Sequence, residues 1–126
     1  MKDDEKKLIT ANKLYRSRKF KESIPLYEAL ASKGFYGCAR RLGWMYFLEE
    51  GVERDLSKSL RWLNMASESD DNEAKFAIGK VYLYQGKWEE AANQFTLTAR
   101  EGFAPSMYRL GWIALQEGKT DQLVVG

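Results

Sequence analysis

The chain has 126 residues, of which 44% are hydrophobic and 30% charged. This length and composition are typical of one globular domain and exclude a disordered or membrane-embedded protein. Its 20 Lys and Arg against 18 Asp and Glu give a formal net charge of +2, which argues against nucleic acid or an anionic membrane as the main partner. Histidine, the commonest general base and nitrogen ligand of metals, is absent. We therefore expect no enzyme activity, no metal and no cofactor.

The N-terminal residues 1–7 are mostly charged and contain no apolar segment of the kind that a secretory signal requires. Cys38 is the single cysteine, so no intramolecular disulfide can form. No apolar run approaches the roughly 20 residues that a membrane-spanning helix needs. These features predict a protein of the cytoplasm.

Apolar residues recur at helical spacing along the whole chain, as Ile24, Tyr27 and Leu30 show. Turn-forming residues separate these stretches, and Asp55 is suited to cap a helix start. The last turn signal is Gly118. The expected helices lie near 4–17, 20–33, 36–49, 55–69, 72–85, 88–101 and 104–117.

The chain also repeats itself. Gly43, Gly79 and Gly111 are 36 and then 32 residues apart (79−43 and 111−79), and a further step of 32 back from Gly43 reaches Ala11. Other equivalent positions of the repeat, which form columns when its copies are aligned, keep the same steps. One column holds Phe20, Leu56 and Trp88, and another holds Tyr27, Leu63 and Phe95. A helical bundle with accidental spacing is the alternative, but agreement between independent columns favours a repeat. The small residue in each first helix is expected to let a neighbouring helix approach closely.

Two stretches carry the motifs of a known family. Residues 78–82 read Ile-Gly-x-x-Tyr and residues 91–95 read Ala-x-x-x-Phe, which resembles the tetratricopeptide repeat. Residues 38–63 contain Cys-x-x-x-Leu-Gly-x-x-Tyr, then Gly-Val-Glu-Arg-Asp, then Ser-x-x-Trp-Leu, and resemble its longer Sel-one-like variant.

The resemblance covers nearly the whole chain as about three and a half helix-turn-helix units. They lie near 4–34, 36–70, 72–102 and 104–126, within a single domain of residues 1–126. The last unit is expected to be incomplete, because Ala114 replaces the motif tyrosine and few residues follow Gly118. The resemblance implies an all-α fold, a right-handed α-α superhelix, that serves as a non-catalytic scaffold or adaptor for a peptide or protein.

By the same resemblance, the first helix of each unit lines a concave face. Arg, Trp and Tyr on such a face are the residue types that dominate binding hot spots, and a groove of cations and rings suits an acidic peptide. For Trp44 and Trp112 the alternative is packing between repeats, and for Phe47 and Phe76 a core position is favoured. The candidate partner-binding residues are Asn12, Arg16, Arg40, Trp44, Lys80, Tyr84, Tyr108 and Trp112.

Other polar groups are better explained without a site. The basic run 16–21 lies at a predicted turn, where a solvated turn is favoured over an anion site. Glu49-Glu50 and Asp70-Asp71 lie at predicted helix ends, where capping explains them better than acid–base catalysis. Residues 118–120 read Gly-Lys-Thr but lack the earlier glycine of a phosphate-binding loop. Cys38 occupies a small-residue core position and has no histidine to activate it.

The last predicted helix offers an alternative function. Leu110, Ile113 and Leu115 have no following partner helix in the sequence, and the ends of a helical array need covering. The alternative is therefore an oligomerisation or regulatory module that acts through this open C-terminal edge, as a homo-oligomer or with another chain.

Overall fold

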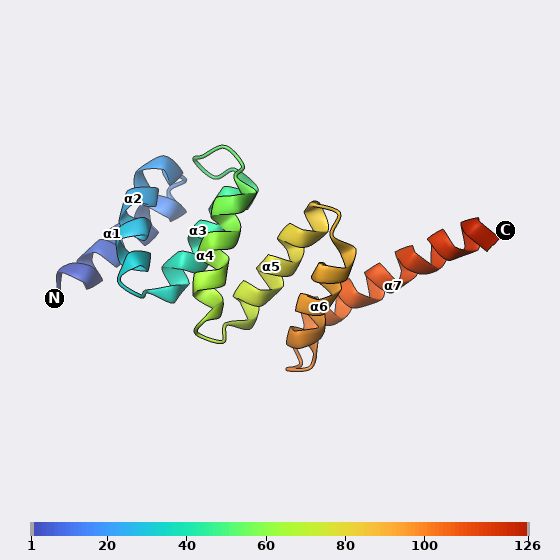
Figure 1. The fold of residues 1–126 in the computed structure, drawn as a ribbon. Helices are drawn as coiled ribbons and strands as arrows, with labels where there is room; N and C mark the ends of the chain where they lie inside the picture. The colour runs from blue at the N-terminus through green and yellow to red at the C-terminus, as the bar shows by residue number, and fades with distance from the viewer. Residues whose placement is uncertain (1, 126) are drawn as a thin grey trace. The chain divides into compact units, whose positions relative to one another are not determined.

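The computed structural model describes the backbone of residues 2–125 and the side chains of residues 2–117. This part of the chain contains helices and no strand (Figure 1). The first six expected helices agree with the structure to within two residues at each end. The helices are α1 Asp3–Arg16, α2 Phe20–Ser32, α3 Tyr36–Leu48, α4 Leu56–Ser67, α5 Asn72–Tyr84, α6 Trp88–Ala99 and α7 Ala104–Val125.

The chain divides into two compact units, Met1–Ala74 and Lys75–Gly126, which are called unit 1 and unit 2 below. Each is described by itself. None of the described helices combines the length and the apolar character that crossing a membrane would require.

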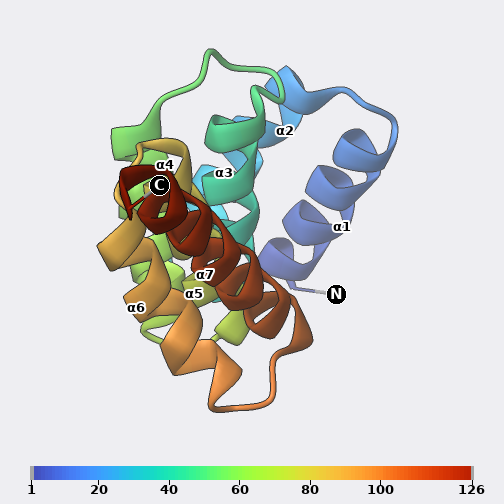
Figure 2. The ribbon, with the colours of Figure 1, turned by 90° about the vertical axis from the view of Figure 1, so that its right-hand side faces the viewer.

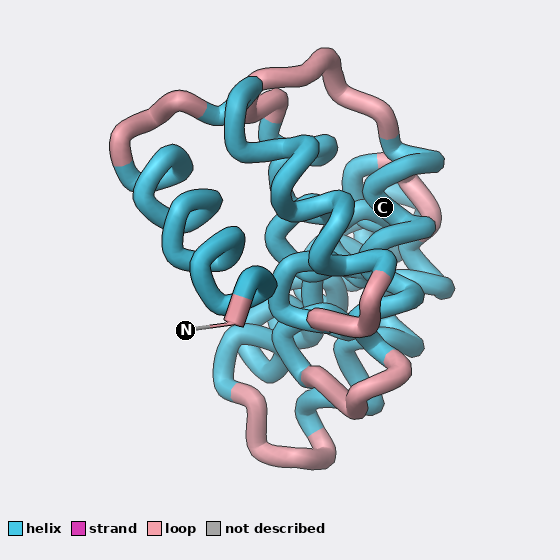
Figure 3. The backbone as a smooth tube through the Cα atoms, turned by 90° about the vertical axis from the view of Figure 1, so that its left-hand side faces the viewer, coloured by secondary structure: helices cyan, strands magenta, loops and turns pink. Residues whose placement is uncertain are grey.

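Unit 1 is built from consecutive helices that pack side by side, α1 on α2, α2 on α3 and α3 on α4. Its core is a cluster of buried side chains that includes Tyr27, Leu30, Leu42 and Met45. The helices are joined by loops, drawn in pink in Figure 3. In the loop before α4, Asp55 caps the helix as expected, because its carboxylate accepts a hydrogen bond of 3.0 Å from the backbone N–H of Lys58.

Unit 2 contains most of α5 together with α6 and α7, and α6 lies against α7 (Figure 2). Ala91, Phe95 and Ile113 are buried at its centre. Phe76 packs on Phe95 with ring centroids 5.5 Å apart and on Phe103 with centroids 5.6 Å apart. The core position favoured for Phe76 is thereby confirmed.

The motif glycines explain the repeat physically. A Cβ atom placed on Gly43 would come within 2.4 Å of the Leu63 side chain, and one on Gly79 within 2.5 Å of the Phe95 ring. The second helix therefore approaches so closely that a hydrogen must replace a methyl group in the first. Ser59 reinforces this contact, since its hydroxyl donates a hydrogen bond of 2.7 Å to the backbone carbonyl of Gly43.

The third motif glycine differs. A Cβ on Gly111 would meet no described atom within 4 Å. The packing reason that applies at Gly43 and Gly79 is therefore absent at this position. The face of α7 that carries Gly111 has no helix packed onto it in the described part of unit 2.

The predicted end of the last helix is wrong. We expected the helix to stop at residue 117 and a turn at Gly118, by analogy with Gly86, but α7 continues to Val125. A glycine costs about 1 kcal/mol inside a helix without ending it, and no proline follows it. The backbone at Gly86 has a φ of +78°, whereas residue 118 is helical. The side chains from residue 118 onward lie outside the described ones, so the expected open edge is described only through Leu110, Ile113 and Leu115.

Candidate protein-interaction surfaces

An exposed apolar surface lies on α7 in unit 2. Met107, Tyr108, Gly111, Trp112 and Leu115 line a shallow hollow of about 370 Å³. The Tyr108 side chain is 70% exposed, and Met107 and Leu115 are more than half exposed. We call these five residues the α7 face. It contains two of the predicted partner-binding residues, Tyr108 and Trp112.

The ring of Trp112 is held in place by a neighbour. It stacks on the ring of Trp88 at the start of α6, with centroids 5.6 Å apart and planes inclined by 10°. Stacking restricts the side chain while Trp112 still lines the hollow. A ring that is ordered before binding loses little conformational entropy when a partner arrives.

Two further predicted residues lie on α5. Tyr84 is 56% exposed near the end of the helix. Lys80 is partly buried, and its pKa is lowered, first by burial and then by the positive charge of Arg109 on α7. Lys80 and Arg109 thus place two like charges close together in unit 2. Such a pair favours a negatively charged neighbour.

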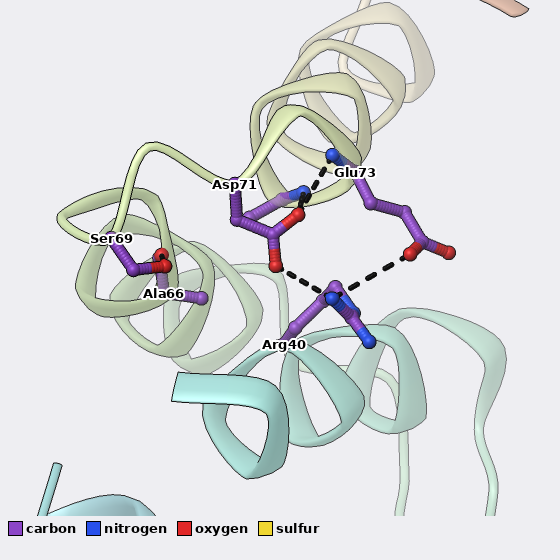
Figure 4. A network of polar contacts seen from close by, with 6 residues as sticks. Arg40, Ala66, Ser69, Asp71 and Glu73 are labelled. Atoms are coloured by element: carbon purple, nitrogen blue, oxygen red, sulfur yellow. Dashed lines mark hydrogen bonds and ion pairs between the residues drawn. The ribbon is translucent and has the colours of Figure 1, made fainter. Parts of the chain in front are cut away.

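In unit 1, Arg40 has a structural role that its sequence position did not reveal. Its guanidinium donates to a carboxylate oxygen of Asp71 at 2.6 Å and lies 3.6 Å from Glu73 (Figure 4). The other oxygen of Asp71 accepts hydrogen bonds from the backbone N–H groups of Glu73 and Ala74 at 2.9 and 3.2 Å. Asp71 therefore caps the start of α5, as the helix-end interpretation expected, and Arg40 ties this cap to α3.

Trp44 lies partly buried on α3. Its ring makes an edge contact with Phe47, with centroids 6.2 Å apart. Phe47 is only 9% exposed, so its favoured core position is confirmed. Trp44 is therefore packed against Phe47 and is partly exposed as a residue.

Asn12 and Arg16, on α1, lie at the wall of a hollow of about 500 Å³. The carbonyl oxygen Oδ1 of Asn12 accepts a hydrogen bond of 2.7 Å from the hydroxyl of Tyr27. The hollow brings these two predicted residues together with Arg18, Arg41 and Glu50, which the sequence interpretation had left out or assigned to turns and helix ends.

Cys38 is buried, as expected of a core position. Burial raises the pKa of its thiol, and the nearby Arg41 opposes this shift without reversing it. A thiol that stays protonated at neutral pH is a poor nucleophile. Among the described residues, no group of His, Cys, Asp and Glu side chains is arranged to hold a metal ion.

Taken together, these features define an all-α helical-repeat protein with exposed aromatic and basic surfaces. The family model described as Sel1 repeat matches residues 38–71 and 104–123. The first stretch corresponds to the repeat whose sequence motifs resemble the Sel-one-like repeat. These matches support a Sel1-like repeat protein with an all-α helical-repeat fold.

A solved structure supports the same fold. The crystal structure of a Sel1 repeat protein from Oxalobacter formigenes matches with a TM-score of 0.70 and 23% sequence identity. The match covers 88% of this chain and 49% of that one, so the chain spans about half the length of that protein. A comparison with curated proteins finds no match. Sel1 repeat proteins generally mediate protein–protein interactions and generally act as non-catalytic scaffolds.

Proposed function

We propose that this chain is a cytoplasmic, non-catalytic scaffold that binds a peptide or protein segment along the first helices of its repeats. The observation that carries the proposal is the α7 face, where exposed Tyr108 and stacked Trp112 border an apolar hollow. Aromatic anchors beside a hollow are the usual centre of a binding hot spot. The paired charges of Lys80 and Arg109 favour a partner with acidic side chains.

The proposal is tested by selecting peptides from a random displayed library on the immobilised chain and measuring their affinity by fluorescence anisotropy. Tyr108→Ala and Trp112→Ala are each expected to weaken binding by tenfold or more, since hot-spot truncations cost about 2 kcal/mol or more. Leu97→Ala is the matched control, because Leu97 is a half-exposed apolar residue of α6 outside the hollow. Equal affinities for the wild type and both aromatic variants would exclude the α7 face.

A second candidate function is self-association through the same face. The observation in its favour is Gly111, which has open space where Gly43 and Gly79 have the side chain of a second helix. The exposed side chains of Met107 and Leu115 flank this opening. An apolar, close-packing surface of this kind suits a helix from a second copy of the chain.

Sedimentation velocity at several protein concentrations tests self-association. If copies pair through the α7 face, the sedimentation coefficient rises with concentration for the wild type and not for Leu115→Glu, which places a charge on the face. Leu97→Glu is the control on α6. A wild-type chain that sediments as a monomer at every concentration would exclude this function and leave the scaffold proposal standing.

A further inference from the structure

The hollow formed by α1, the following turn and α3 in unit 1 is rich in arginine. Arg16, Arg18 and Arg41 line it, with Glu50 as its one carboxylate and the rings of Tyr15 and Phe20 as apolar wall. We call it the arginine pocket. Its side chains therefore carry an excess of two positive charges.

The three guanidinium groups are not neutralised within the described part of the chain. None of them forms an ion pair there. The carboxylate of Glu50 instead accepts a hydrogen bond from the hydroxyl of Tyr15, which lies 3.0 and 3.1 Å from its two oxygens. Arg41 forms a hydrogen bond with the hydroxyl of Tyr27, so its remaining N–H groups and those of Arg16 and Arg18 are available to a ligand.

Aromatic rings hold two of these arginines. The guanidinium carbon of Arg41 lies 4.1 Å from the centroid of the Tyr15 ring, and that of Arg18 lies 5.5 Å from the Phe20 centroid. Cation–π contact uses the flat face of a guanidinium and leaves the N–H groups at its edge for hydrogen bonds. The pocket therefore presents oriented donors rather than freely moving side chains.

Arg18 also occupies a backbone position that favours glycine. Its φ is +63°, in the left-handed region, and the residue at the same place in the next such turn, Gly86, has a φ of +78°. The two turns are closed by equivalent hydrogen bonds, from Arg18 N–H to Tyr15 and from Gly86 N–H to Leu83. A non-glycine residue in this conformation carries backbone strain, as Glu49 and Asp70 also do, and such residues are enriched at functional sites.

We propose that the arginine pocket binds the phosphate group of a phosphorylated side chain on the partner protein, and this proposal rests on the scaffold function proposed above. A phosphate monoester carries about two negative charges at neutral pH and three acceptor oxygens, which match the charge excess and the donors of the three arginines. A carboxylate carries only one negative charge, so its attraction to the arginines would offset less of its repulsion by Glu50. The rings of Tyr15 and Phe20 suit the aromatic body of phosphotyrosine.

The test uses a fluorescein-labelled alanine-rich peptide with a single phosphotyrosine and anisotropy titrations on the full chain. It is expected to bind at least tenfold more tightly than the same peptide with tyrosine or with glutamate at that position. Arg18→Gly should weaken binding at least tenfold while leaving thermal stability unchanged or higher, since glycine accepts this backbone conformation readily. Arg61→Ala removes an exposed arginine of α4 outside the pocket and should bind as the wild type does.

Three results would overturn the proposal. Equal affinity for the phosphorylated and unphosphorylated peptides would show that the phosphate group is not recognised. Unchanged binding by Arg18→Gly would show that the peptide does not bind in the arginine pocket. Inorganic phosphate that binds as tightly as the peptide would assign the pocket to a free phosphate compound. The scaffold proposal is tested separately, with Trp112 and Leu97 variants of the α7 face. A failure of the phosphopeptide experiment would therefore not decide whether the α7 face binds a partner.

Discussion

Gly79→Ala is expected to lower the free energy of unfolding by about 1–3 kcal/mol, the usual cost of overpacking a core. Gly111→Ala is expected to raise it by up to about 1 kcal/mol, the difference in helix propensity between the two residues. Both glycines occupy the same place in the repeat and differ only in what faces them. The added methyl group would come within 2.5 Å of the Phe95 ring at Gly79 and would meet no described atom at Gly111.

Urea denaturation followed by circular dichroism measures both changes. Gly43→Ala serves as a second test of the close contact, since its methyl group would lie 2.4 Å from the buried side chain of Leu63. Unfolding free energies that move in the same direction for Gly79→Ala and Gly111→Ala would contradict the packing assignment. If a partner helix docks on the α7 face, Gly111→Ala should also weaken that docking although it stabilises the free chain.

The repeat columns were predictable because they arise from local packing. Leu63 and Phe95 were placed in one column by spacing alone. The structure shows that both cover the motif glycine of their own unit. Helical periodicity and the size of one residue at a fixed place are enough to specify such a contact, which is why the helices before α7 were also predicted to within two residues.

The partners of long polar side chains were not predictable in the same way. Arg40 was expected on a binding face, but its guanidinium reaches Asp71, which is 31 residues later. Spacing places Arg40 on α3 and says nothing about which turn comes within reach of its long side chain. Arg18 carried a usable signal, because the repeat aligns it with Gly86 and so with a left-handed turn.

The wrongly predicted helix end at residue 117 shows a further limit of prediction from sequence. Gly118 aligns with Gly86 in the repeat, but a helix in a protein is stabilised mainly by its packing and not by the propensity of single residues. At Gly86 the chain turns with a φ of +78°, whereas residue 118 stays helical within α7, so the cost of one glycine does not end this helix. Local residue types therefore predicted a turn that the packing did not require.

Phe95→Ala is expected to lower the free energy of unfolding by about 3–5 kcal/mol, the range for removing a buried aromatic ring. Phe95 is completely buried, covers Gly79 and packs on Phe76, so its loss leaves a cavity at the centre of unit 2. Because this is a large part of the stability of a small protein, Phe95→Leu is the milder companion variant. Urea denaturation of both should give the order wild type, Leu, Ala.

A double-mutant cycle separates this cavity from general damage. The methyl group of Gly79→Ala is costly because the ring of Phe95 fills the space it would enter. In a chain that already carries Phe95→Ala, the same methyl group enters the cavity, so Gly79→Ala should become neutral or stabilising there. The coupling free energy between the two positions is then about 1–3 kcal/mol, as residues in direct contact show. Additive effects would mean that the ring does not press on Gly79 in solution, and the physical reason for the motif glycine would have to be sought elsewhere.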